Sequence, residues 1–159
     1  FCLTRLPEAD EVHYNLHIML RFELEVEVIG KNLEVPDLPE AWNSKFKEYF
    51  DRDVEKSSDG ILQDVHWSIG AFGYFPTYTL GNLNAGCLFE KMREDIPSLA
   101  DGFEKGDVSL AKTWLTENIH QHGSLYEPAE LIKKATGKAF TPEPFLNYLD
   151  EKFSDIYGI

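Results

Sequence analysis

Apolar residues in the first thirty positions of the chain recur at helical spacing. Pro7 suits a first helical turn and Gly30 suits the end of a helix, so we predict a helix from near Pro7 to Gly30. Residues 22–28 alternate strictly between apolar and acidic side chains and would serve equally well as a β-strand. Because no turn signal separates this run from the helical pattern before it, we predict that the helix continues through it. The helical spacing is carried by Val12, Leu16, Met19 and Leu20.

Prolines mark the start of most of the later predicted helices, because proline is favoured in a first helical turn and disfavoured further in. Helices are predicted to begin at Pro39, Pro76, Pro128 and Pro142, and another covers residues 108–119. With the first helix these make about six, and the pattern predicts an all-α fold. We expect a single helical domain over residues 1–159.

Residues 61–76 follow neither helical nor strand periodicity, although they hold several aromatic side chains. Irregular backbone can be buried only if its polar groups find partners. We therefore expect this segment to be irregular and packed against other parts of the chain.

Two predicted helices carry a recognisable packing face. After Pro76, the small residues Gly81, Ala85 and Gly86 would let a neighbouring helix approach closely. In the last helix the apolar residues fall on one side, and we expect that side to face the core. These residues are Phe145, Leu146, Leu149, Phe153 and Ile156.

Composition excludes several classes of function. Hydrophobic residues make up 43% of the chain, as in folded proteins, and 28 acidic residues against 15 basic ones give a net charge of -13. Such a balance opposes binding to nucleic acid and to anionic membranes, which need clustered Lys and Arg. The first residues show no signal-peptide pattern, and Cys2 and Cys87 form neither a disulfide framework nor a metal-ligand spacing. Reduced thiols in a cytoplasmic protein are the simplest account.

Candidate chemistry is concentrated in residues 60–67. Asp64 and His66 stand two residues apart, beside Gln63 and Trp67. A carboxylate near an imidazole can orient the ring, which suits a proton donor or a donor to an oxyanion. The residues alone nevertheless favour a structural role, because most histidines in loops are solvated or bonded locally.

Histidines elsewhere do not form a convincing metal site. His120 and His122 stand two apart, and on a helix such side chains diverge by about 200 degrees. His13 and His17 stand four apart, but Arg21 follows four residues later and would repel a cation. We therefore expect surface histidines there and no metal ligand in this chain. The chain also has no His-Glu-x-x-His, Gly-x-Ser-x-Gly or phosphate-binding Gly-rich motif, and so no complete catalytic machinery.

The run Gly60-x-x-Gln63-Asp64-x-His66-Trp67 is identical to the G-x-x-Q-D-x-H-W signature of the carboxypeptidase Taq family, and the chain resembles the C-terminal part of its members. The resemblance covers residues 9–159. It is also carried by residues 9–12, 14–18, 68–82, 117–120, 128–131 and 157–158.

The resemblance implies the C-terminal portion of a helical, zinc-type metallocarboxypeptidase, which releases single residues from peptide C-termini. In that family zinc or cobalt is held by H-E-x-x-H and a downstream Glu, and both precede the region matched here. We therefore expect no metal in this chain and no activity from the chain alone.

The resemblance also implies roles for individual residues. His66 would donate to the tetrahedral oxyanion and Asp64 would hold His66, as the catalytic residues. Gln63, Trp67 and Tyr74 would line the substrate side.

The family's I-R-x-x-A-D motif would supply an arginine for the substrate's terminal carboxylate. Here that position holds Leu6, and Arg5 lies one residue too early, which turns a helical side chain by about 100 degrees. Arg5 stays a candidate for substrate binding.

Two functional hypotheses follow. The chain is the C-terminal portion of a metallocarboxypeptidase that supplies the substrate and oxyanion wall of the cleft, or it is a non-catalytic helical domain that binds peptides or itself. Part of a larger core should expose apolar helix faces. We therefore expect a homo-oligomer, or association with the N-terminal catalytic part that is missing here.

Overall fold

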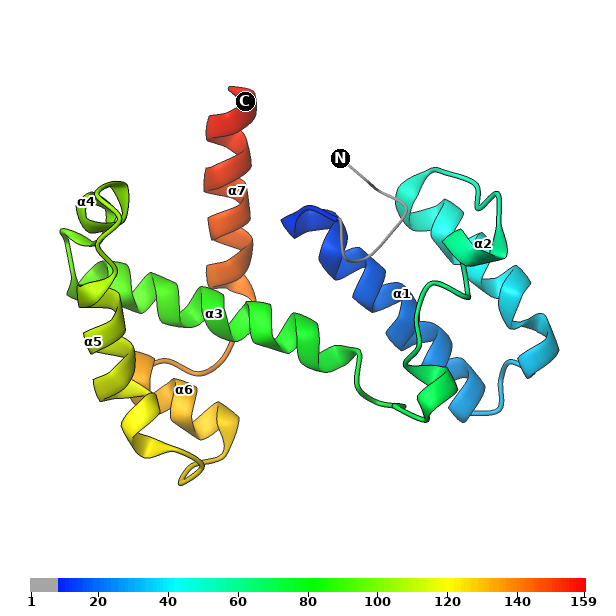
Figure 1. The fold of residues 1–159 in the computed structure, drawn as a ribbon, viewed down its shortest axis with the longest axis horizontal. Coiled ribbons are helices and arrows are strands. Elements are labelled where there is room, and N and C mark those ends of the chain that lie inside the picture. Colours follow the sequence, from blue (N-terminus) through cyan, green and yellow to red (C-terminus); the bar gives the residue numbers. More distant parts are fainter. Residues whose placement is uncertain (1–8) are drawn as a thin grey trace. The chain divides into compact units, whose positions relative to one another are not determined.

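The computed structural model describes residues 9–159, and their regular structure is entirely helical (Figure 1). Seven α-helices and no β-strand occur in this range, which confirms the all-α prediction. The additional helix is α4 (Leu99–Glu104), a short one that follows Pro97. The chain divides into two compact units, residues 1–80 and 81–159. The single domain over residues 1–159 stays a prediction.

Helix α1 spans Glu11–Ile29 and begins later than predicted. The Asp10 carboxylate accepts hydrogen bonds from the backbone N–H groups of Val12 and His13, both at 3.0 Å, and so caps the helix. Pro7, where we placed the start, lies outside the described residues. The alternating run is helical, as predicted, and among residues 9–159 no helix is both long and apolar enough to cross a bilayer.

Helix α2 (Leu38–Phe50) packs along α1 in the first unit. It follows a single 3₁₀ turn, Val35–Asp37, so the prolines at 36 and 39 stand where the helical structure starts. The two helices bury one apolar cluster, to which the apolar face of each helix contributes side chains. Its members are Leu20, Leu24, Trp42, Phe46 and Phe50.

The segment between α2 and α3 is irregular, as predicted, apart from the 3₁₀ turns Ser57–Asp59 and Trp67–Ile69. It is less buried than we expected. Phe75 is fully buried and packs on Ile18 of α1, whereas Ile69 and Phe72 are more than half exposed. The packed part of the segment is therefore the part that contacts α1.

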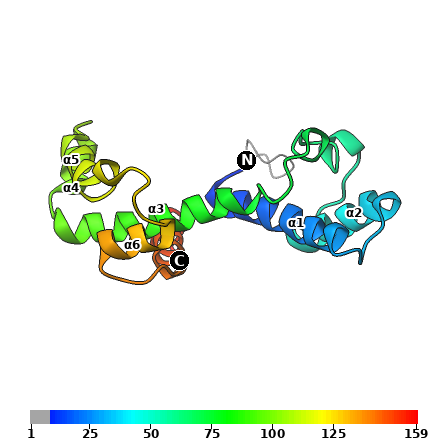
Figure 2. The same cartoon turned by 90° about the horizontal axis from the view of Figure 1, so that it is seen from below.

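In the second unit the helices after α3 (Pro76–Asp95) gather around its C-terminal part (Figure 2). They are α4, α5 (Ser109–Asn118), α6 (Pro128–Thr136) and α7 (Glu143–Tyr157), with a 3₁₀ turn over His120–His122. Their core is made of Met92, Leu99, Ala111, Trp114 and Ala135. Cys87 is a buried free thiol.

Gly86 allows α7 to pack closely against α3. A Cβ added at Gly86 would lie 2.7 Å from the Cβ of Phe145, so only glycine fits there. The predicted close approach is thus found at Gly86, whereas Gly81 has no neighbour within 4 Å of such a Cβ.

The predicted core-facing side of α7 is correct only in part, because Phe145, Leu149 and Phe153 are partly buried while Leu146 and Ile156 are not. Leu146 and Ile156 are 55% and 58% exposed, and no residue of α7 is fully buried. The helix contacts α3 through Phe145 and Tyr148, and this contact covers one side of the helix only. Of the predicted side, Leu146 and Ile156 therefore face outward.

Candidate functional site

Arg21 of α1 connects that helix to the loop over residues 60–67. Its side chain is completely buried. Its Nε donates to Asp64 Oδ2 at 2.5 Å, one Nη donates to Gln63 Oε1 at 3.0 Å, and the other donates to the backbone oxygen of His17 at 2.7 Å. A single guanidinium thus holds two adjacent residues of the signature.

The charge of Arg21 is compensated inside the protein. A buried cation is costly unless it is paired and hydrogen-bonded, and here Asp64 supplies the opposite charge. The guanidinium also lies 4.8 Å from the ring centre of Trp42, which adds a cation–π contact. Burial lowers the pKa of Arg21, and the neighbouring Asp64 carboxylate opposes that effect.

His66 lies beside Asp64 and two tyrosines. Its Nε2 is 3.2 Å from the hydroxyl of Tyr78, and its ring stacks at 5.8 Å on Tyr74. Its Nδ1 faces Asp64 Oδ1 at 3.6 Å, which is too long for a hydrogen bond. Within residues 9–159, this buried nitrogen has no hydrogen-bond partner. Asp64 and His66 therefore interact by charge and orientation rather than by a formed hydrogen bond.

Trp67 is held from the same helix by Glu25. The indole N–H donates to Glu25 Oε2 at 2.8 Å, and the backbone N–H of Gly73 donates to the other oxygen of that carboxylate. Glu25 is only 7% exposed. The Trp67 ring meets Trp42 edge-on at 6.2 Å. Trp67 is thus held in the first unit by a hydrogen bond at its N–H group and by aromatic packing at its ring.

The structure brings together five of the six residues predicted for the site. Gln63, Asp64 and His66 follow one another in the loop, and Trp67 and Tyr74 border it. Tyr74 is the most open of them, at 49% exposed. Arg5 lies outside the described residues. The catalytic and substrate-binding roles of these residues stay predictions.

The prediction that His17 is a surface histidine is wrong, and the importance of Arg21 and Glu25 was missed. His17 is fully buried and its ring lies 4.5 Å from that of Phe50. A signal was present in the sequence: His17, Arg21 and Glu25 stand four residues apart, next to the apolar positions of the same helix. Such a polar row on a buried face indicates a hydrogen-bonded network. His13 is partly exposed and bonds Asp10 at 2.7 Å.

The contact of Tyr78 with His66 was also missed, because it depends on where the start of α3 lies in the folded chain. It lies at the start of α3, twelve residues after His66, and its hydroxyl reaches the ring of His66. Burial and the neighbouring Tyr74 raise the pKa of Tyr78, so its hydroxyl stays protonated at neutral pH.

The described part of the chain offers no metal site: no three His, Cys, Asp or Glu side chains come together there in a way that could hold an ion. The full sequence has no His-Glu-x-x-His either. Residues 9–159 therefore do not fit a catalytic metal.

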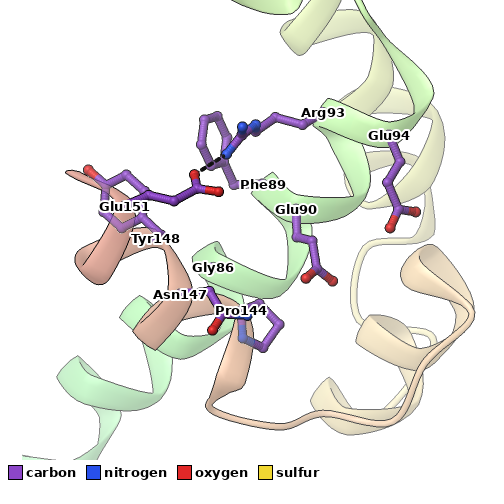
Figure 3. A pocket seen from close by; sticks show the side chains of 9 residues that line it. All are labelled: Gly86, Phe89, Glu90, Arg93, Glu94, Pro144, Asn147, Tyr148 and Glu151. Carbon is purple, nitrogen blue, oxygen red and sulfur yellow. Dashed lines mark hydrogen bonds and ion pairs between the residues drawn. The ribbon is translucent and has the colours of Figure 1, made fainter. Parts of the chain in front are cut away.

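A separate cavity of about 380 Å³ lies between α3 and α7 in the second unit (Figure 3). Its charged lining is paired: Arg93 bonds Glu151 at 2.9 Å, and Lys138 reaches Glu90 and Glu94 at 3.0 and 3.3 Å. Its polar groups are those of a surface ion-pair cluster rather than of a reactive site.

Comparisons with known proteins support the resemblance noted in the sequence. The family model of the carboxypeptidase Taq (M32) metallopeptidases matches residues 3–153. Carboxypeptidase 1 of Bacillus subtilis is 43% identical over 150 residues, and thermostable carboxypeptidase 1 of Thermus thermophilus is 44% identical over 151 residues. These alignments cover 94% and 95% of this chain, which spans about 30% of the length of each relative.

Solved structures agree with this result. The M32 carboxypeptidase of Deinococcus radiodurans matches with a TM-score of 0.94 and 39% identity, over 98% of this chain and 32% of that one. Trypanosoma cruzi metallocarboxypeptidase 1 matches with a TM-score of 0.89 and 38% identity, over 93% of this chain and 31% of that one. The chain therefore belongs to the carboxypeptidase Taq (M32) metallopeptidase family.

Proposed function

We propose that this chain supplies the substrate and oxyanion wall of a metallocarboxypeptidase site, with His66 as the donor to the reacting carbonyl oxygen. The observation that carries the proposal is the pair of contacts at the imidazole: Asp64 Oδ1 faces Nδ1, and the Tyr78 hydroxyl lies beside Nε2. A ring oriented in this way is what an oxyanion donor needs, since preorganised donors lower the barrier most.

The chemistry follows from the two ring nitrogens. When both carry a proton, Nδ1–H points to the Asp64 carboxylate and Nε2–H is directed toward Tyr78. A substrate carbonyl oxygen entering beside Tyr78 would accept from Nε2, and negative charge that develops on it would strengthen that hydrogen bond. The Tyr78 hydroxyl, which stays protonated, offers a second donor at the same place.

Substrate contacts are proposed for Gln63, Trp67 and Tyr74. Gln63 accepts a hydrogen bond from Arg21, and Trp67 donates one to Glu25. These bonds favour a rigid wall over a flexible one. Tyr74 is half exposed next to His66 and offers the open aromatic surface. The substrates would be peptide C-termini, with Arg5 a candidate for binding the terminal carboxylate.

The metal of such a site would come from outside these 159 residues. We propose zinc or cobalt as that metal, bound by an N-terminal catalytic part, and we expect the isolated chain to be inactive. The cytoplasm is the proposed location.

We also propose that apolar surface on α1 mediates association with that part or with a second copy. Exposed apolar side chains follow one face of the helix from end to end, in contrast to the polar row on its buried face. They are Val12, Met19, Phe22, Val26 and Ile29. The same surface favours the alternative function, a non-catalytic helical domain that binds peptides or itself.

The first test measures zinc and cobalt content and carboxypeptidase activity of the purified chain, before and after metal is supplied. We expect neither stoichiometric metal nor cleavage. Metal bound at sub-micromolar affinity together with cleavage would contradict the proposal, and His13, His17, His120 and His122 would then be the ligands to mutate.

A chimera tests the role of His66. This chain would replace the matching segment of the Bacillus subtilis carboxypeptidase, to which it is 43% identical. His66→Ala should lower kcat about 100- to 1,000-fold and change KM little, since an oxyanion donor acts in the transition state. Arg93→Lys, at an exposed ion pair, is the control. An unchanged kcat would remove His66 from the mechanism.

A further inference from the structure

We propose that Arg21 is a positioning residue for His66, and that its guanidinium fixes which oxygen of Asp64 faces the imidazole. That His66 is catalytic rests on the proposed function. The contacts through which Arg21 positions His66 are all made by residues of this chain. Arg21 is completely buried, so it acts through Asp64 rather than on a substrate.

The two carboxylate oxygens of Asp64 face different groups. Oδ2 accepts from Arg21 Nε at 2.5 Å, while Oδ1 lies 3.6 Å from His66 Nδ1. Because a carboxylate is planar, a strong hydrogen bond at one oxygen fixes the direction of the other. Arg21 thus sets the direction from which negative charge acts on the ring.

Arg21 also fixes the position of the loop through Gln63. A neighbouring N–H of the same guanidinium donates to Gln63 Oε1 at 3.0 Å. Arg21 therefore binds two consecutive side chains, 42 and 43 residues further along the chain. Two contacts to adjacent residues define both the position and the rotation of the loop, whereas one contact would define the position only.

The position requires arginine rather than lysine. A guanidinium presents its donors in a rigid planar fork, while a lysine ammonium is a point charge on a flexible stem. Trp42 and Phe75 lie 4.8 and 5.8 Å from the guanidinium carbon, and Phe75 also contacts the His66 ring at 4.6 Å. Lysine could keep the charge next to Asp64 but could not hold Gln63 and Asp64 in the same plane.

The test on the chain itself compares Arg21→Lys with Arg93→Lys, the same substitution at an exposed arginine that also bonds a carboxylate. Helical content and thermal melting first establish that each variant is folded. The ¹⁵N chemical shifts of the His66 ring and the indole N–H signal of Trp67 are then recorded. Trp67 is the internal reference, because Glu25 rather than Arg21 holds it.

We expect Arg21→Lys to move the His66 ring signals while the Trp67 signal stays, and Arg93→Lys to change neither. Unchanged His66 signals would overturn the proposal, because a positive charge at position 21 would then be enough to orient the His66 ring. Equal changes at His66 and Trp67 would also overturn it, since they would indicate a general packing role.

If Arg21→Lys does not fold, Gln63→Leu serves in its place. This substitution removes one of the two loop contacts of the guanidinium and leaves its charge. The proposal requires the His66 signals to move in this variant as well, and unchanged signals would refute it.

The kinetic test uses the chimera described above. Arg21→Lys should lower kcat on the order of 10- to 100-fold, the scale expected for a misplaced catalytic group, with KM almost unchanged. The double variant with Asp64→Asn should lose no more than Asp64→Asn alone, because both changes break one connection. A raised KM with unchanged kcat, or additive losses, would contradict the positioning role. An inactive chimera would count against the proposed function, while the ring signals would still decide the proposal for Arg21.

Discussion

In the first unit the guanidinium of Arg21 is fully buried between Asp64 and Gln63, whereas in the second unit that of Arg93 meets Glu151 at the surface, where both side chains are more than half exposed. The two pairs have the same chemistry but different surroundings. A buried ion pair cannot exchange its partner for water, so it fixes geometry. A surface pair can, and it contributes little to stability. In the first unit the ion pair therefore holds a loop in place, whereas the ion pair of the second unit fixes little.

Removing each arginine should give the largest difference in stability between the two ion pairs. Arg21→Met leaves the Asp64 carboxylate without its buried partner and should lower the free energy of unfolding by about 3–5 kcal/mol. Arg93→Met should cost about 0–1 kcal/mol. Urea unfolding of the two variants checks the difference, and equal losses would show that burial does not decide the value of these pairs.

The tryptophans give a second comparison. Trp67→Phe removes the indole donor from the buried Glu25 carboxylate and should cost about 1.5–3 kcal/mol, as for other hydrogen bonds to charged groups. Trp114→Phe removes the matching bond to Asp95 in the second unit, where that carboxylate is 38% exposed and water can replace the donor. We expect a smaller loss there. Thermal unfolding of both variants measures the difference, and a larger loss for Trp114 would contradict it.

Two glycines test the reliance of the second unit on close packing. Gly86→Ala places a Cβ against the backbone and Cβ of Phe145 and should destabilise by about 1–3 kcal/mol. Gly81→Ala, with open space at its Cβ, should stabilise by up to about 1 kcal/mol through helix propensity. Denaturant midpoints of the two variants should move in opposite directions. A shift of both in the same direction would refute the packing argument.

The smallest expected effect concerns acid stability. Burial works to raise the pKa of Asp10, but the hydrogen bonds from His13 and Val12 outweigh it and hold that pKa below its usual value. A carboxylate with a lowered pKa in the folded state stabilises above its unfolded pKa, and the stabilisation is lost as the pH falls through the folded one. The loss should thus occur below about pH 4.

Asp10→Asn keeps a good N-cap and removes the charge. It should lower stability at neutral pH by about 0.3–1 kcal/mol, toward the low end because the site is near solvent, and it should flatten the acid side of the stability curve. Unfolding measured between acid and neutral pH checks the curve. An unchanged slope for Asp10→Asn would exclude Asp10 as a source of acid sensitivity.

Most of the helices could be predicted because proline and apolar spacing are local signals. Pro76 and Pro128 begin their helices as predicted, and Gly137 ends α6 in the left-handed conformation. The exposure of Leu146 and Ile156 on α7 could not be predicted, because spacing shows which residues share a side and not how much of that side another element covers.

For the candidate site, the sequence pointed to a loop whose candidate residues the structure brings together, but not to what holds that loop. Gln63, Asp64 and His66 could be found from a compact signature. Arg21 was missed because a charged residue on a helix is usually exposed, and its place in the row with His17 and Glu25 was the only sign that it is not. Its partners become visible only when the loop is folded against α1.

The contact between Arg21 and Asp64 also has a consequence for folding kinetics. It joins residues 43 positions apart, while the helices of the second unit are connected by short links. Closing so long a segment costs chain entropy before any bond repays it, and non-local contacts of this kind slow the approach to the native state. Unless α1 and α2 have first formed their apolar cluster, the guanidinium has no dry surface on which to meet the loop. The imidazole should therefore be among the last groups to reach its native place, and among the first to leave it when the protein opens locally.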